Sequence, residues 1–131
     1  MRFVIDGQFP TATHQTKKVR FCGGKPVFYE PERLASARAY FMAKLAEHRP
    51  EKDAGGAIYL QVVWRFKRPK KCRPDEHWKT TRPDTDNLMK LLKDCMTDSG
   101  FWKDDSQVCR EEALKVYGDE PKVEITVRRL D

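Results

Sequence analysis

The chain concentrates short carboxylates in one segment, from Arg82 to Val108, which contains six aspartates and no glutamate. Asp84 and Asp86 lie at the start of a predicted helix, and Asp104-Asp105 come just before a predicted strand. Such a strand can direct one carboxylate back toward the helix, so that Asp84, Asp86 and Asp105 could meet at one point. Three carboxylates do not sit close together without a cation, and aspartate oxygens suit Mg²⁺. The spacing therefore indicates a candidate metal site.

Each of these aspartates also has an ordinary structural explanation. A carboxylate near a helix N-terminus can cap free N–H groups or interact with the helix dipole, which would account for Asp84 and Asp86. Lys90 and Asp94 follow Asp86 at four-residue intervals and could form an exposed ion-pair ladder. Asp104-Asp105 could be turn formers. From spacing alone, the metal site and the surface interpretation are about equally supported.

Two other kinds of metal site do not match the pattern. An EF-hand loop beginning at Asp84 would need Gly at its sixth position and Glu at its twelfth, where the chain has Met89 and Cys95. The three histidines are isolated, and the four cysteines show no C-x-x-C spacing, so neither a zinc site nor a redox pair is indicated.

A basic tract precedes the aspartates. Residues 65–82 contain eight basic and two acidic side chains, so this tract carries a net charge of +6, which is the formal net charge of the whole chain. A tract like this is often only a solvated loop, but beside carboxylates it suggests a track for the phosphates of a nucleic acid. A second basic feature lies on a predicted hairpin. The candidate DNA-binding residues are Lys17, Lys18, Arg20, Lys67, Arg68, Lys70, Lys71, Arg73, Lys79 and Arg82.

Length and composition limit the class of protein. The 131 residues form one predicted domain, residues 1–131, and 35% of them are charged. No apolar run is long enough to span a membrane, and the first residues lack the apolar region of a signal peptide. The four scattered cysteines are therefore expected to be reduced thiols in a cytoplasm.

Hydrophobic periodicity predicts an α/β domain with a mixed sheet and two main helices packed on it. A strand is expected over residues 1–7, a hairpin over 17–29, and a helix from Pro31 to before Pro50 with Leu34, Ala37, Phe41 and Leu45 on its apolar face. Residues 57–66 are predicted to form a central strand, and residues 84–99 the second helix. The final strands, 108–117 and 122–129, are expected to pair as a hairpin through residues 118–121.

One long motif ties the acidic residues together. The chain reads Pro83-Asp84-x-Asp86-Asn87-Leu88-x-Lys90-x-x-x-Asp94, then Gly100, then Asp104-Asp105-x-Gln107-Val108. This combination resembles the RusA family, the Holliday junction resolvases of bacteriophages and prophages. The resemblance is strong over residues 82–108 and weaker in the flanking segments. The early basic segment departs from the family's Arg-Pro-Arg pattern, because it reads Lys18-Val19-Arg20.

The resemblance implies an α/β homodimer that cuts four-way DNA junctions with Mg²⁺, for which Mn²⁺ can substitute. It places the catalytic, metal-binding acids at Asp84, Asp86 and Asp105 and the essential lysine at Lys90, with Asp94 and Asp104 as accessory acidic positions. Paired hydrolytic nicks leaving a 5′-phosphate, a phage or prophage origin and action in a bacterial cytoplasm are the corresponding expectations.

Two alternatives use the same residues. A nuclease directed at flaps or forks would share the site, and a protein that only binds junction DNA would have lost catalysis. Three aromatic residues near the tract and the motif could stack on opened bases. Core or dimer packing is the expected role of Phe101 and Trp102, whereas the role of Trp78 is left open by the sequence.

Overall fold

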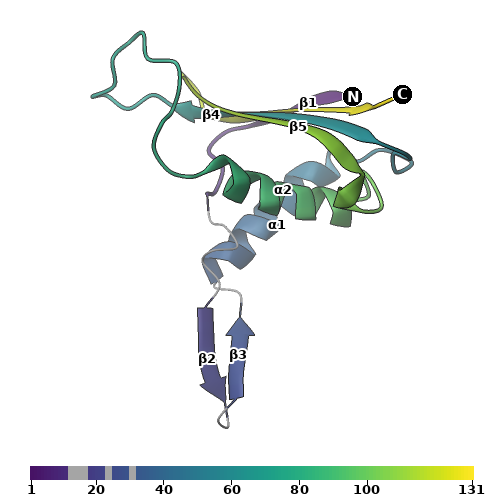
Figure 1. The fold of residues 1–131 in the computed structure, drawn as a ribbon. Coiled ribbons are helices and arrows are strands. Elements are labelled where there is room, and N and C mark those ends of the chain that lie inside the picture. The colour runs from purple at the N-terminus through teal and green to yellow at the C-terminus, as the bar shows by residue number, and fades with distance from the viewer. Residues whose placement is uncertain (12–17, 23–24, 30–31) are drawn as a thin grey trace.

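The computed structural model describes residues 1–11, 18–22, 25–29 and 32–131 (Figure 1). Its strands alternate with two long helices, and a single 3₁₀ turn, η2 (Asp105–Gln107), precedes β5. The strands are β1 (Arg2–Asp6), β2 (Lys18–Cys22), β3 (Lys25–Tyr29), β4 (Ile58–Lys67), β5 (Val108–Gly118) and β6 (Lys122–Arg129), and the helices are α1 (Glu32–Ala46) and α2 (Thr85–Asp98). The predicted α/β class, with two main helices on a mixed sheet, is confirmed.

The main sheet has the strand order β1-β6-β4-β5. Strand β4 is central, as predicted: it pairs in parallel with β5 and antiparallel with β6. Both helices cover the same face of this sheet (Figure 1). Strands β2 and β3 form a separate antiparallel ribbon, which confirms the early hairpin and which Figure 1 shows extending away from the sheet beyond α1.

The predicted hairpin between the last two strands is wrong. Strands β5 and β6 are not neighbours, because β4 lies between them and pairs with both. β4 has the most apolar and most buried sequence of the sheet, so each of the two strands gains more by pairing with it than with the other. The connection must cross two strand spacings, about 10 Å, which three extended residues can span. The backbone N–H of Arg68 holds this crossing by donating to the carbonyl of Gly118 at 3.0 Å.

The core lies between the sheet and the helices. Trp64 of β4 is completely buried, and Leu34, Ala37, Phe41 and Leu45 form the buried face of α1, as predicted. The predicted inner residues of α2 are buried, and so are Met89 and Met96. Phe101 and Trp102 are each 1% exposed, which confirms their packing role in the core. No helix among the described residues is both long and apolar enough to cross a bilayer.

Candidate active site

The N-terminal end of α2 presents Asp84 and Asp86. Asp84 occupies the N-cap position, and its backbone carbonyl accepts from the N–H of Leu88 at 3.2 Å. Its carboxylate makes no capping hydrogen bond, although N-cap aspartates commonly do so. Asp86 follows in the first helical turn, and both side chains are exposed. Helix capping therefore does not account for Asp84, and two short carboxylates stand together at a helix end that favours negative charge.

Lys115 of β5 fixes the chain that leads into this helix. Its Nζ donates to the carbonyl of Thr81 at 2.6 Å and to the carbonyl of Pro83 at 2.7 Å. A positive charge on two carbonyl oxygens gives strong, charge-assisted hydrogen bonds. The backbone immediately before Asp84 is thereby held to the sheet, so Asp84 and Asp86 are presented by a fixed segment.

Lys90 lies on the exposed side of α2, with 60% of its side chain accessible. Its Nζ lies 4.0 Å from Oδ1 of Asp94, one helical turn further on. The expected stripe of Asp86, Lys90 and Asp94 is therefore present in part as an ion pair. An exposed pair of this kind contributes little to stability, so it does not explain why the three charges occur together.

The C-terminal end of α2 faces a second acidic group. After the helix, Gly100 adopts φ +85°, a conformation that other residues rarely adopt, and the chain turns back toward η2. A shallow cavity of about 290 Å³ lies at this end, and Asp105 opens into it. The cavity is lined by Arg38, Asp94, Thr97, Asp98, Lys103, Asp104 and Asp105.

Asp104 and Asp105 have different environments. The carboxylate of Asp104 accepts from the N–H of Ser106 at 2.9 Å and caps η2. The backbone and side-chain hydrogen bonds with Ser106 hold the pKa of Asp104 below its usual value. Asp104 thus has a structural task, whereas Asp105 occupies the first position of η2 and lines the cavity. The accessory role predicted for Asp104 is less well supported than the metal-binding role predicted for Asp105.

Gln107 locks this acidic turn to the sheet. Its Oε1 accepts from the backbone N–H groups of Lys103 and Asp104, and its Nε2 donates to the carbonyls of Ala54 and Gly56. The amide therefore joins the loop before β4 to the turn that carries Asp105. The sequence motif included Gln107 without a role for it; the D-x-x-Q spacing, which is that of a capping box, was the signal that could have predicted one.

The three predicted metal ligands do not meet within this chain. Among the described residues, no three His, Cys, Asp or Glu side chains lie close enough together to hold a metal ion. Asp105 shares a cavity with Asp94, and Asp94 lies eight residues beyond Asp86, which is about 12 Å along a helix. The chain instead has two acidic half-sites: an N-terminal half-site of Asp84 and Asp86, and a C-terminal half-site that contains Asp105.

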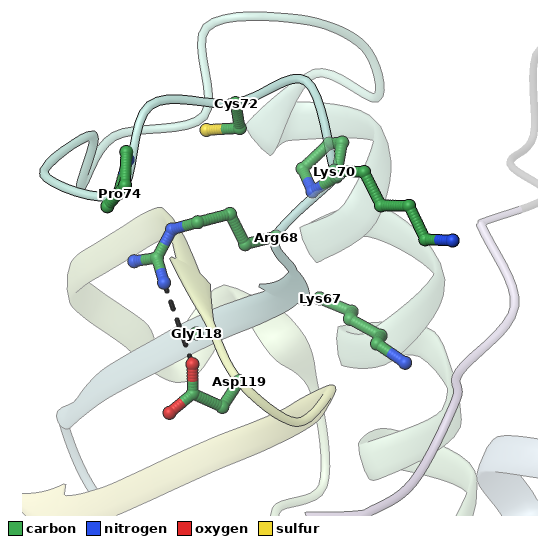
Figure 2. Close-up of a pocket in the computed structure, with 8 residues that line it drawn as sticks. Lys67, Arg68, Lys70, Cys72, Pro74, Gly118 and Asp119 are labelled. Carbon is green, nitrogen blue, oxygen red and sulfur yellow. Dashed lines mark ion pairs between the residues drawn. The ribbon is translucent and has the colours of Figure 1, made fainter.

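Basic residues surround a separate pocket at the end of β4 (Figure 2). Arg68 lies across this pocket, with Nη1 3.6 Å from Oδ1 of Asp119 and Nη2 3.4 Å from the carbonyl of Glu76. The buried Nε of Arg68 has no hydrogen-bond partner among the described residues. Lys67 and Lys70 also line the pocket. This pocket can accept an anion, because its guanidinium has a donor to spare and its ion-pair partner is a carboxylate that is almost fully exposed.

The other predicted DNA-binding residues differ in placement. Lys71, Arg73 and Arg82 are exposed, as a phosphate contact requires. Lys79 is instead engaged internally: its Nζ donates to Oγ1 of Thr81 at 2.7 Å and lies over two aromatic rings. Burial, and then the charge of Lys115, lower the pKa of Lys79. Lys17 and the side chains of Lys18 and Arg20 lie outside the described residues.

Comparison with known proteins connects these features. The family model for endodeoxyribonuclease RusA matches residues 8–128. The chain is 34% identical over 132 residues to the crossover junction endodeoxyribonuclease rusA of Lactococcus phage r1t, covering 98% of this chain and 95% of the phage protein. It is also 30% identical over 117 residues to the uncharacterized protein YqaN of Bacillus subtilis strain 168, covering 82% of each. This chain belongs to the RusA endodeoxyribonuclease family.

Family membership gives the two half-sites a chemical meaning. In a RusA-family nuclease, carboxylates that the fold leaves uncommitted are the natural candidates for catalysis. Lys115 and Gln107 then act as positioning residues, one for each half-site. No sequence pattern marked Lys115, because its two acceptors are backbone carbonyls more than thirty residues away in the chain.

Proposed function

We propose that this RusA-family nuclease hydrolyses phosphodiester bonds at four-way DNA junctions, with Mg²⁺ as the physiological cofactor and Mn²⁺ as a substitute. The observation that carries the proposal is the pair of exposed, uncapped carboxylates, Asp84 and Asp86, fixed at a helix N-terminus beside a basic tract. The family match and the name of the phage relative support the substrate class. Paired symmetric nicks, a 5′-phosphate product and action in the bacterial cytoplasm are part of the proposal.

The donor set suits a hard divalent cation. Asp84, Asp86 and Asp105 offer aspartate oxygens, which Mg²⁺ prefers, and the structure does not engage the Asp84 carboxylate in a cap. When bound between these carboxylates and a phosphate, Mg²⁺ lowers the pKa of a coordinated water and polarises the phosphate oxygens. Lys90 projects from the same helix one turn after Asp86, and we assign it to stabilise negative charge that develops on the phosphate during hydrolysis.

The separation of the half-sites leads to a proposal about assembly. We infer that the complete site forms between two protomers, with Asp84 and Asp86 of one chain facing Asp105 of the other. A two-fold axis that sets two α2 helices side by side in opposite directions would create two such sites at once. This arrangement replaces the expectation that the three carboxylates meet within one chain, and it would make dimerisation a requirement for metal binding. It also supplies the two matching sites that paired cuts need.

The basic residues would hold the DNA through its backbone. Lys67, Arg68 and Lys70 surround a pocket suited to a phosphate group, while Lys71, Arg73 and Arg82 are exposed in the same tract. Contacts of this kind position a protein on DNA without reading its base sequence, so they are consistent with selection by DNA shape. The β2–β3 ribbon, with Lys18 and Arg20, is a further candidate contact surface.

The deciding experiment is nicking of a synthetic four-way junction. Purified protein is incubated with the junction, with a flap and with a linear duplex, in Mg²⁺ and in excess chelator. We expect Mg²⁺-dependent nicking of the junction, and we expect Asp86→Asn to abolish nicking while binding is kept or tightened. Asp6→Asn, an exposed aspartate on β1, is the matched control and should cut normally. Preferential cutting of the flap would favour the flap-directed alternative, and binding without cutting would favour the inactive one.

A further inference from the structure

Trp78 is exposed in a protein whose other tryptophans are buried. Its side chain is 56% accessible, whereas Trp64 and Trp102 are 0% and 1% exposed. Apart from Met1 at the chain terminus, it is the one large hydrophobic residue exposed to this extent among the described residues. The ring contributes little to the core, so its exposure calls for another explanation.

The backbone around Trp78 is fixed to the sheet. The N–H of Tyr117 donates to the carbonyl of His77 at 2.8 Å, and the N–H of Lys79 donates to the carbonyl of Lys115 at 3.0 Å. Trp78 itself forms an isolated antiparallel bridge with Val116 of β5. These bonds add residues 77–79 to the outer edge of the sheet as a very short strand. An exposed ring on such a support loses little backbone freedom when it binds a partner.

The His77 ring further limits how the indole can move. The two ring centroids lie 4.8 Å apart with an interplanar angle of 78°, an edge-to-face arrangement. Lys79, on the other side, is held over the rings of Phe66 and Tyr117. The indole is therefore supported from one side and accessible on the other.

The position of Trp78 relates it to the N-terminal half-site. Trp78 lies six residues before Asp84, and both ends of the intervening segment are held by β5: Lys79 by the backbone of Lys115, and Pro83 by its Nζ. Residues 65–82 carry the excess positive charge of the chain. A phosphate backbone drawn to this tract would bring nucleobases next to the indole.

We propose that Trp78 stacks on a nucleobase at the open end of a base stack in branched DNA, close to the scissile phosphate. The inference rests on the proposed action on branched DNA and adds an element that selects the branch point. A continuous duplex has no free base face, whereas the arms of a junction end at the branch. Aromatic stacking tolerates any base, because every base has a π face. A second copy of this chain is a poorer occupant, since it would bring two copies of the +6 tract together.

Tryptophan fluorescence tests the proposal directly, because Trp78 is the accessible tryptophan of the three. With Asp86→Asn as a non-cutting background, we expect junction DNA to quench the emission and to protect it from acrylamide, and linear duplex to do neither. Trp78→Ala should weaken junction binding roughly five- to hundredfold, with Trp78→Phe retaining most of the affinity. Duplex affinity should stay the same. Lys71→Ala is the contrasting control, since removing a phosphate-binding charge weakens both DNA shapes alike.

Three results would overturn the inference: no change in emission on junction binding, an equal loss of junction and duplex affinity in Trp78→Ala, or a shift of that variant from dimer to monomer in sedimentation. The last would make the indole a subunit contact. Failure of the proposed function is distinguishable. A wild-type protein that never nicks a junction, yet is quenched by it, would reject the nuclease assignment and keep the stacking role. Normal nicking with an unaltered Trp78→Ala variant would reject the stacking role alone.

Discussion

Mixing two inactive variants tests whether the active site forms between protomers. One variant lacks the N-terminal half-site, through Asp84→Asn and Asp86→Asn together, and the other lacks the C-terminal carboxylate, through Asp105→Asn. Each homodimer should be inactive, because every site in it lacks at least one metal-binding carboxylate. If the half-sites combine across a dimer, a mixed dimer holds one site with all three substitutions and one site with none.

The structure sets the expected magnitude. Random exchange of equal amounts of the two variants makes about half of the dimers mixed, and each mixed dimer has one intact site of two. The mixture should therefore nick a junction at about a quarter of the wild-type rate per protein, whereas the separate variants should be silent. Resolution into two linear products should be far below a quarter, because one mixed dimer cuts only one strand.

The assay is gel analysis of a junction labelled on each strand in turn, after the variants have been incubated together long enough to exchange. Exchange is verified by mixing tagged with untagged wild-type protein and recovering the untagged chain on the tag. If exchange is complete and the mixture stays silent, the three carboxylates act within one chain. That result would require the turn that carries Asp105 to move by about the 12 Å that separates the half-sites.

Lys90, the basic tract and Asp104 each give a further prediction. Lys90→Ala should keep junction affinity and lower the single-turnover cleavage rate by roughly 10²–10³-fold, since its charge acts in the transition state; weak binding with normal cleavage at saturation would make it a phosphate contact. Neutralising Lys70, Lys71 and Arg73 together should reduce the slope of log affinity against log salt by roughly one unit for each phosphate that these residues no longer neutralise, whereas an unaltered slope would show a solvated loop. Asp104 has a lowered pKa, so its ionised form stabilises the fold above its unfolded pKa, and this contribution is lost as pH falls through the folded pKa. Asp104→Asn should thus be less stable than wild type to urea at neutral pH, and the two should converge near about pH 2.

The sequence predicted the elements of the fold better than their pairing. Periodicity gave the buried face of α1 and the central position of β4 correctly, because burial is a local pattern of side chains. It failed for β5 and β6, which a short connection and alternating residues made look like a hairpin. Strand order depends on which partner buries more apolar surface, and that competition involves β4, more than forty residues away in the chain.

The site was predicted by residue type and not by geometry. Asp84 and Asp86 were correctly placed at a helix start, and the uncapped state of Asp84 removes the main structural explanation for it. The convergence with Asp105 failed because the helix between them is straight and the return turn is pinned at its far end. Periodicity reports faces of a helix, but the separation of two groups at opposite ends depends on its length.

Both half-sites are exposed yet fixed, and this combination favours assembly over local closure as the way the site is completed. Lys115 holds the approach to Asp84 through two carbonyls, and Gln107 holds the turn of Asp105 through four backbone groups. Breaking such a set of bonds to bring the halves together within one chain would cost several hydrogen bonds at about 1 kcal/mol each. A second protomer can bring its own fixed half-site to the first without breaking any of them. Rigid halves that are joined only by dimerisation would also keep a free protomer from cutting DNA.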